Sequence, residues 1–189
     1  MSSGPAPADP PDRQGGPDTP TRCGFVAILG APNAGKSTLV NALTGAKVSI
    51  VTPKVQTTRT RVMGVMMVGE SQVVLVDTPG IFKPSKRLDR AMVAAAWQSA
   101  ADADVIAVLV DAERNRGETD AQTRRIVEGL ANSKRSGLLL LNKIDRVRRA
   151  DLLEIAARLN AEGAFSDTFM ISALTGDGVD DLRTDFAQR

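Results

Sequence analysis

Residues 30–38 read GAPNAGKST and directly follow the apolar run FVAIL at residues 25–29. The stretch matches the pattern G-x-x-x-x-G-K-[ST] and precedes a segment with helical periodicity, which is the strand–loop–helix context of a phosphate-binding loop. In such a loop, main-chain N–H groups surround an anion and the helix N-terminus adds its dipole. A chance glycine-rich turn would leave this context unexplained. We therefore expect a nucleoside triphosphate to bind Gly30, Ala31, Pro32, Asn33, Ala34, Gly35, Lys36, Ser37 and Thr38.

Two side chains of this stretch have distinct chemical roles. The Lys36 ammonium can place a positive charge on the β- and γ-phosphates, which makes it a candidate catalytic residue. The Ser37 hydroxyl can ligate Mg²⁺, a hard cation that prefers oxygen ligands.

Composition limits the other chemistries that the chain can perform. It has 189 residues, a formal net charge of +2, one cysteine and no histidine. The length suits one ordinary domain, and the missing histidine excludes a histidine base or metal ligand. A single cysteine excludes an internal disulfide and fits a reducing compartment. We expect Cys23 to be a small buried hydrophobic residue rather than a nucleophile.

The first 22 residues differ from the rest in composition. They carry six of the ten prolines and contain no hydrophobic segment, so they resemble neither a secretory signal nor a folded element. We expect residues 1–22 to be a disordered tail and residues 23–189 to be one domain. The chain also has no apolar run near the roughly 18–20 residues that span a bilayer, and we expect it to be cytoplasmic.

From Cys23 onward, short apolar runs alternate with segments of helical period. The runs are CGFVAIL, VMGVMMV, QVVLVD, DVIAVLVD, GLLLLN and DTFMIS. Most are continuously apolar, which is typical of strands covered on both faces. The expected helices are Gly35–Thr44, Leu88–Ala101, Thr119–Asn132, Ala150–Ala161 and Val179–Ala187, with Thr119 and Gln122 as a capping box for the third. The pattern predicts an α/β fold with a mostly parallel sheet and helices on both faces.

Two regions depart from this alternation. The short turn GES at residues 69–71 joins two apolar runs, so we expect an antiparallel hairpin there. The segments Ala46–Thr60 and Gly80–Arg87 lack periodicity although ordered elements surround them. Long loops of this kind in a compact domain tend to be functional or mobile.

The segment VVLVDTPG at residues 73–80 carries the second candidate site. Asp77 ends an apolar strand, and ligands of parallel α/β sheets bind at strand carboxyl ends. Its carboxylate can hold Mg²⁺ through water, and the Gly80 N–H can meet a γ-phosphate. A turn-capping role for Asp77 is the alternative. We place Thr78 and Pro79 in the same nucleotide site.

The segment LLLLNKID at residues 138–145 points to guanine. Guanine presents N1–H and an exocyclic amine side by side, and the Asp145 carboxylate can accept from both. Adenine would leave that carboxylate unmatched, which sites of this type reject. Asn142 can connect this loop to the phosphate-binding loop, and the Lys143 stem can cover the base. A merely polar strand end is the alternative.

The last motif is FMISAL, where another apolar run ends with Ser172, Ala173 and Leu174. A main-chain N–H there, for which we favour Ala173, can donate to guanine O6. The tripeptide alone carries no weight. The same order of motifs at successive strand ends makes a GTP site the consistent interpretation.

In the order GAPNAGKST, QTTR, DTPG, NKID and SAL, the sequence resembles the Era family of translation-factor-class GTPases. The segment after DTPG, with KP, L and AMV, distinguishes Era from its relatives TrmE and Der. The resemblance covers Cys23 to the C-terminus. It implies a Ras-like fold with six strands, one of them an antiparallel edge strand, and a slow GTP-hydrolysing switch. It also implies that Thr58 of QTTR ligates Mg²⁺ in the GTP state.

The resemblance further implies partners. Era proteins act with the small ribosomal subunit and its ribosomal RNA through a KH domain, for which this sequence has no pattern, and they can associate peripherally with the bacterial inner membrane. We expect no DNA partner. A TrmE- or Der-like GTPase domain and a nucleotide-binding module with negligible turnover are the alternatives.

Hydrolysis needs a further explanation because Ile81, which follows DTPG, cannot orient water as a glutamine would. Arg59 and Arg61 are candidate cations for the transition state. Asn33 is another route, since its amide oxygen can ligate K⁺ beside the phosphates, as in K⁺-dependent relatives such as TrmE. A hydrogen bond of Asn33 within the loop is the alternative.

Overall fold

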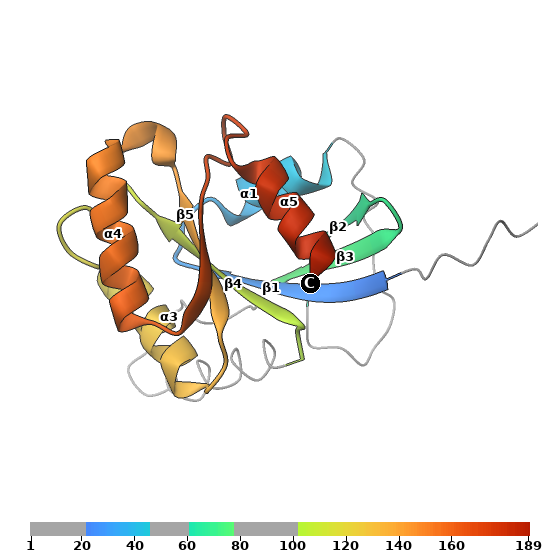
Figure 1. The fold of residues 1–189 in the computed structure, drawn as a ribbon, viewed down its shortest axis with the longest axis horizontal. Helices are drawn as coiled ribbons and strands as arrows, with labels where there is room; N and C mark the ends of the chain where they lie inside the picture. The colour runs from blue at the N-terminus through green and yellow to red at the C-terminus, as the bar shows by residue number, and fades with distance from the viewer. Residues whose placement is uncertain (1–21, 46–60, 78–101) are drawn as a thin grey trace, which may run out of the picture.

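The computed structural model describes residues 22–45, 61–77 and 102–189 (Figure 1). Over these ranges the chain forms one six-stranded sheet with strand order β2-β3-β1-β4-β5-β6. The strands are β1 (Arg22–Gly30), β2 (Arg61–Val68), β3 (Ser71–Asp77), β4 (Val105–Asp111), β5 (Gly137–Asn142) and β6 (Phe165–Met170). β2 pairs antiparallel with β3, and every other neighbouring pair is parallel. The predicted sheet, with its antiparallel edge strand, is confirmed.

The antiparallel pair is joined where the sequence predicted a turn. Gly69 and Glu70 form the connection, and Gly69 has a positive φ of 57°. The pairing brings Val68 opposite Ser71, so the hairpin closes directly at the turn.

The described helices are α1 (Lys36–Thr44), α3 (Ala121–Asn132), α4 (Arg149–Glu162) and α5 (Val179–Gln188), with a 3₁₀ turn η1 (Ile144–Arg146). The ends of α1, α3, α4 and α5 each lie within two residues of the ends of a predicted helix. The helix expected at Leu88–Ala101 and the loops expected at Ala46–Thr60 and Gly80–Arg87 lie outside the described residues.

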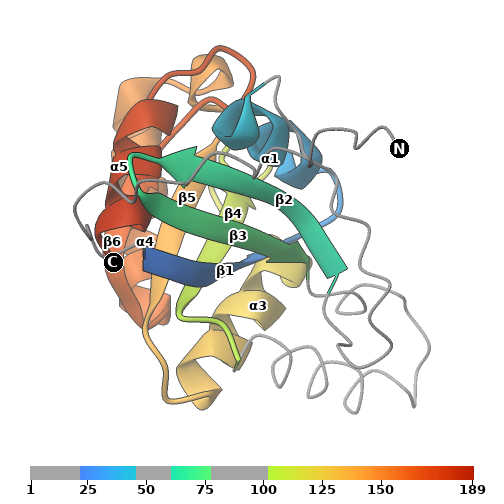
Figure 2. The same ribbon diagram turned by 90° about the vertical axis from the view of Figure 1, so that its right-hand side faces the viewer.

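The helices cover both faces of the sheet (Figures 1 and 2). α1 and α5 pack on one face with Val26 and Ile28 of β1. α3 and α4 pack on the other face with Ala27 and Leu29. Successive residues of a strand point to opposite faces, so a continuously apolar run supplies both cores.

Three expectations about the strands need correction. Cys23 is exposed rather than buried, and β1 begins at Arg22, which we had assigned to the tail. The first residues of β1 precede the part of the strand covered by helices, which starts at Val26. The last strand, β6, is not covered on both faces as its apolar sequence suggests. It lies at the edge of the sheet, and its residues are half-buried or exposed because only β5 flanks it within the described residues.

The start of α3 also differs from the expected capping box. The N-cap is Asp120, whose carboxylate accepts from the main-chain N–H groups of Gln122 and Thr123. Thr119 lies outside the helix, and its hydroxyl donates to Glu162. Thr119 and Asp120 are both good capping residues by type, so the choice between them depends on the tertiary contacts of Thr119.

The parallel strands bring their carboxyl ends to one edge of the sheet. β1 pairs Ile28 with Asp77 and Gly30 with Leu109, and β4 pairs Asp111 with Asn142. Segments far apart in the sequence therefore meet at this edge, where parallel α/β sheets bind their ligands.

Candidate functional site: a nucleotide site at the strand carboxyl ends

The phosphate-binding loop runs from the end of β1 to the start of α1. Its main chain takes positive φ angles at Asn33 (64°) and Gly35 (101°), and Ala34 N–H donates to Ala31 O at 3.1 Å. Gly35 is required by its φ and because a Cβ there would collide with the Asn142 amide. No side chain caps the N-terminus of α1. These features are those of an anion-binding nest that opens a helix.

Lys36 lies along this loop. Its ammonium donates to Gly30 O at 2.7 Å and to Ala31 O at 3.3 Å. Ser37 and Thr38 follow it on the first turn of α1, and both are exposed. The cation and the two hydroxyls are thus grouped at the start of α1.

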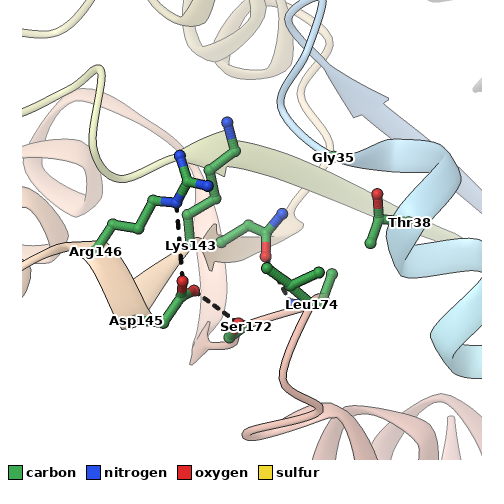
Figure 3. A pocket seen from close by; sticks show the side chains of 9 residues that line it. Gly35, Thr38, Lys143, Asp145, Arg146, Ser172 and Leu174 are labelled. Atoms are coloured by element: carbon green, nitrogen blue, oxygen red, sulfur yellow. Dashed lines mark hydrogen bonds and ion pairs between the residues drawn. The ribbon is translucent and has the colours of Figure 1, made fainter.

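Beside the loop lies a cavity of about 180 Å³. This volume is smaller than the roughly 300–1,000 Å³ of typical small-molecule sites, and it suits a base better than a whole nucleotide. Figure 3 shows Gly35 and Thr38 on one side of it and Asp145 and Ser172 on the other. The lining residues are Gly35, Thr38, Asn142, Lys143, Asp145, Arg146, Ser172, Ala173 and Leu174.

Asn142 connects the two halves of the site. Its buried side-chain amide donates to Ala34 O at 2.8 Å, and its Oδ1 accepts from the Ala173 N–H at 2.9 Å. The predicted connection to the phosphate-binding loop is therefore present. The contact with Ala173 has a consequence for base recognition, because a guanine O6 would have to share that N–H or use that of Leu174.

Asp145 is held at the rim of the cavity. Its Oδ1 accepts from the Ser172 hydroxyl at 2.7 Å, and its side chain is 23% exposed. A carboxylate oxygen has two lone pairs, so both oxygens can still accept from a ligand. This arrangement is the one expected of a carboxylate that reads two adjacent donors.

Lys143 adopts a left-handed conformation with a φ of 67°. Its ammonium pairs with Oδ2 of Asp111, whose side chain is only 3% exposed. The stem of Lys143 thus extends along the wall of the cavity and its charge is directed away from it (Figure 3).

Sequence reasoning missed the loop between β4 and α3 as part of this site. Arg114 donates to Pro32 O in the phosphate-binding loop at 3.2 Å, and Glu113 pairs with Arg146 at 3.3 Å. The loop is itself well held, because the fully buried Asn115 donates to Asp111 O and to the Asp120 carboxylate. The spacing of these residues in the sequence carries no signal of these contacts.

Several predicted site residues are not placed. Thr58, Thr78, Pro79 and Gly80 lie outside the described residues, and of Asp77 only the main chain at the end of β3 is described. Among the described residues no group of three or more His, Cys, Asp or Glu could hold a metal. Nucleotide sites bind Mg²⁺ through few protein oxygens together with phosphates and water. Ser37 offers such an oxygen.

The part of the chain that the structure describes also contains no helix long and apolar enough to cross a membrane.

Comparison with known proteins identifies the family. Residues 25–143 match the family described as 50S ribosome-binding GTPase. The chain is 55% identical over 168 residues to GTPase Era of Bradyrhizobium sp. (strain ORS 278), covering 89% of this chain and 54% of that protein. The chain thus spans about half the length of the curated relatives it matches.

Solved structures agree. Era bound to MgGDPNP and nucleotides 1506–1542 of 16S ribosomal RNA is 36% identical with a TM-score of 0.69, over 89% of this chain and 57% of that one. An Aquifex aeolicus Era variant bound to GDP and AlF₄⁻ is also 36% identical, with a TM-score of 0.68 over 88% and 56%. The chain therefore belongs to the family of 50S ribosome-binding GTPases, as a relative of GTPase Era.

Proposed function

We propose that this chain binds GTP with Mg²⁺ and hydrolyses it slowly to GDP and phosphate. The observation that carries this proposal is the position of Asn142, which joins the phosphate-binding loop at Ala34 to the base-binding segment at Ala173. One side chain thereby fixes the spacing between the site for phosphate and the site for guanine.

Guanine binding rests on Asp145, with Ser172 holding one of its oxygens. On the phosphate side, the Lys36 ammonium exchanges its loop carbonyls for β- and γ-phosphate oxygens. The cost of this exchange is small because the ammonium passes from neutral oxygens to charged ones. Gly80, which lies outside the described residues, is the residue whose N–H would donate to the γ-phosphate.

When bound, Mg²⁺ would neutralise part of the charge on the phosphates. Ser37, Thr58 and, through water, Asp77 are the residues that would hold it. The positions of Ser37 at the start of α1 and of Asp77 at the end of β3 support this assignment. Thr58, which lies outside the described residues, is the proposed ligand in the GTP state.

K⁺ is the proposed second cation. Ile81 cannot orient water, and the transition state still needs positive charge near the phosphates. Asn33 is exposed in the phosphate-binding loop, and the described residues show no hydrogen bond to its side chain, which leaves the amide oxygen available for a monovalent ion.

The family resemblance supports a place for this switch in assembly of the small ribosomal subunit and maturation of its ribosomal RNA. The Era structure with a 16S ribosomal RNA segment supports the same subunit. The low aromatic content of 3% and the net charge of +2 argue against strong RNA binding by residues 1–189 alone. A cytoplasmic location with peripheral contact at the inner membrane completes the proposal.

The test is a phosphate-release assay with GTP and Mg²⁺, together with titration of a fluorescent GDP. We expect GDP binding without added partners and slow phosphate release that ribosomal particles can change. If the chain binds GDP but releases no phosphate, either alone or with ribosomal particles, it acts as a nucleotide-binding module without turnover. No binding of guanine nucleotides would refute the proposal.

A further inference from the structure

Arg146 places a positive charge beside the carboxylate that is proposed to read guanine. It follows Asp145 in the 3₁₀ turn η1 and lines the same cavity. Its Nε lies 3.9 Å from Oδ2 of Asp145, which is an ion-pair distance but is too long for a hydrogen bond. A small movement of the Arg146 side chain would therefore close a charge-assisted hydrogen bond onto that oxygen.

Such a bond would compete with the ligand. Asp145 already gives one lone pair of Oδ1 to the Ser172 hydroxyl. A guanidinium bound to Oδ2 would occupy the oxygen that remains without a hydrogen bond among the described residues, and arginine forms strong paired bonds with carboxylates. Each oxygen of Asp145 would then already accept one hydrogen bond, and the guanidinium would compete with the ligand for Oδ2.

Glu113 draws the guanidinium in the other direction. Its Oε2 accepts from Nη1 of Arg146 at 3.3 Å, whereas the longer contact with Asp145 is made by Nε. Figure 3 shows the Arg146 side chain extended beside Lys143, with its only drawn interaction the long one to Asp145. Arg146 is thus shared between two carboxylates, and its hydrogen bond goes to Glu113.

The position of Glu113 is fixed by the loop that carries it. Oδ1 of Asp111 accepts from the Arg114 N–H at 3.2 Å, and Oδ2 pairs with Lys143. The buried Asn115 donates to Asp111 O at 2.8 Å, and Arg158 of α4 donates to Asn115 O. The main chain on both sides of Glu113 is therefore held, and its side chain projects toward Arg146 from a defined point.

We propose that Glu113 is a positioning residue that holds Arg146 off Asp145 and so keeps the guanine-reading carboxylate available in the empty site. The inference rests on the proposed GTP function. In the absence of Glu113, Arg146 closes onto Asp145 in part of the molecules, and only the open fraction binds nucleotide.

The experiment measures association and dissociation rates of a fluorescent GDP by stopped flow. The variants are Glu113→Ala, Arg146→Met and the double variant, with Glu118→Ala as the matched control. Glu118 lies in the same loop and is exposed, and its side chain makes no hydrogen bond or ion pair within the described residues. Both glutamate substitutions remove the same charge, so the control accounts for long-range electrostatics.

We expect Glu113→Ala to slow association by about twofold to fivefold, which is the upper part of the range for an exposed ion pair, with a dissociation rate within about twofold of wild type. Arg146→Met in the same chain should restore the association rate, because the competitor is gone. Glu118→Ala should leave both rates unchanged.

A double variant that is as slow as Glu113→Ala, or slower, would overturn the proposal. So would a Glu113→Ala effect confined to dissociation, which would indicate damage to the bound site instead. Thermal unfolding of each variant identifies misfolding. If Glu113→Ala does not fold, Arg146→Met alone still tests the competition, because the proposal requires that its association be no slower than that of wild type. Failure of the wild-type chain to bind GDP would refute the GTP function itself, so the two outcomes are distinguishable.

Discussion

The side-chain amide of Asn142 donates to the main-chain carbonyl of Ala34, 108 residues earlier in the chain, over 2.8 Å. The same side chain accepts from Ala173. Three loops that follow three different strands are thereby joined through one buried residue. The relative positions of the phosphate-binding loop and the base cavity depend on it.

Replacement of Asn142 by alanine should therefore cost both stability and affinity. It leaves the Ala34 carbonyl and the Ala173 N–H without their partner in a buried environment, at about 1–3 kcal/mol for each group. We expect the free energy of unfolding in urea, measured without nucleotide, to fall by about 2–6 kcal/mol, with weaker GDP binding in titration.

Asn132→Ala is the matched control, because Asn132 is exposed at the end of α3. It should change the free energy of unfolding by less than about 0.5 kcal/mol. Equal stabilities for the two variants would mean that the Asn142 contacts do not bear on the fold.

Base specificity should rest on Asp145. Asparagine at this position turns one acceptor into a donor, which suits xanthine better than guanine. We expect Asp145→Asn to lower GTP affinity at least about tenfold, or about 1.4 kcal/mol, and to improve binding of xanthosine triphosphate. Competition titrations with both nucleotides measure this exchange, and a variant that binds GTP as tightly as wild type would show that the base site is wrongly assigned.

The strand-end motifs could be predicted from sequence because each depends on local chemistry. Gly35 needs its positive φ, Asn142 and Asp145 follow an apolar run, and their order fixes one sheet edge. The Glu113–Arg146 and Arg114–Pro32 contacts could not be predicted, since they join loops that only the folded sheet brings together. Cys23 was misjudged because residue type alone does not tell which end of a strand the helices cover.

Asp120 should make stability depend on pH. Burial raises the pKa of Asp120, but hydrogen bonds from the Thr123 side chain and main chain, from Gln122 N–H and from Asn115 outweigh it, so the pKa lies below its ordinary value of 3.8. The contribution of the charged carboxylate to the stability of the fold is therefore fully present at pH values above this ordinary pKa. The contribution is lost as the pH falls through the lowered pKa of the folded state.

Comparison of wild type with Asp120→Asn isolates this effect, because asparagine also caps helices but does not titrate. At pH 7 we expect the variant to be less stable by about 1 kcal/mol, and the difference to narrow as the pH falls below about 4. Urea unfolding at pH 7, 5, 4 and 3 measures it. A difference that is constant over this range would contradict the assigned role of the charge.

The proposed Mg²⁺ ligand Thr58 should matter for the triphosphate and little for the diphosphate. Titration of fluorescent GDP against Thr58→Ala should give near-normal binding, while phosphate release from GTP falls. Lys36→Ala is the contrasting variant. It should weaken binding of both GDP and GTP, because a cation in the phosphate-binding loop contacts the β-phosphate of both nucleotides. A loss of GDP binding in Thr58→Ala would contradict a role for Thr58 that is specific to the triphosphate.

The proposed potassium site predicts a salt effect on hydrolysis. Positive charge at the transition state is worth factors of about 10³ to 10⁵, and Ile81 offers no substitute for a water-orienting glutamine. The amide oxygen of Asn33 can ligate K⁺ beside the phosphates. We expect faster GTP hydrolysis in KCl than in NaCl at equal ionic strength, with this difference lost in Asn33→Ala while GDP binding is retained.

Matched ionic strength is essential, because screening alone changes phosphate binding. Asn33 has a positive φ of 64°, and such angles strain alanine more than asparagine, so Asn33→Gly is the second variant. It should lose the K⁺ effect in the same way without that strain. Equal wild-type rates in the two salts would refute the potassium site and direct attention to Arg59, Arg61 or a cation supplied by a partner.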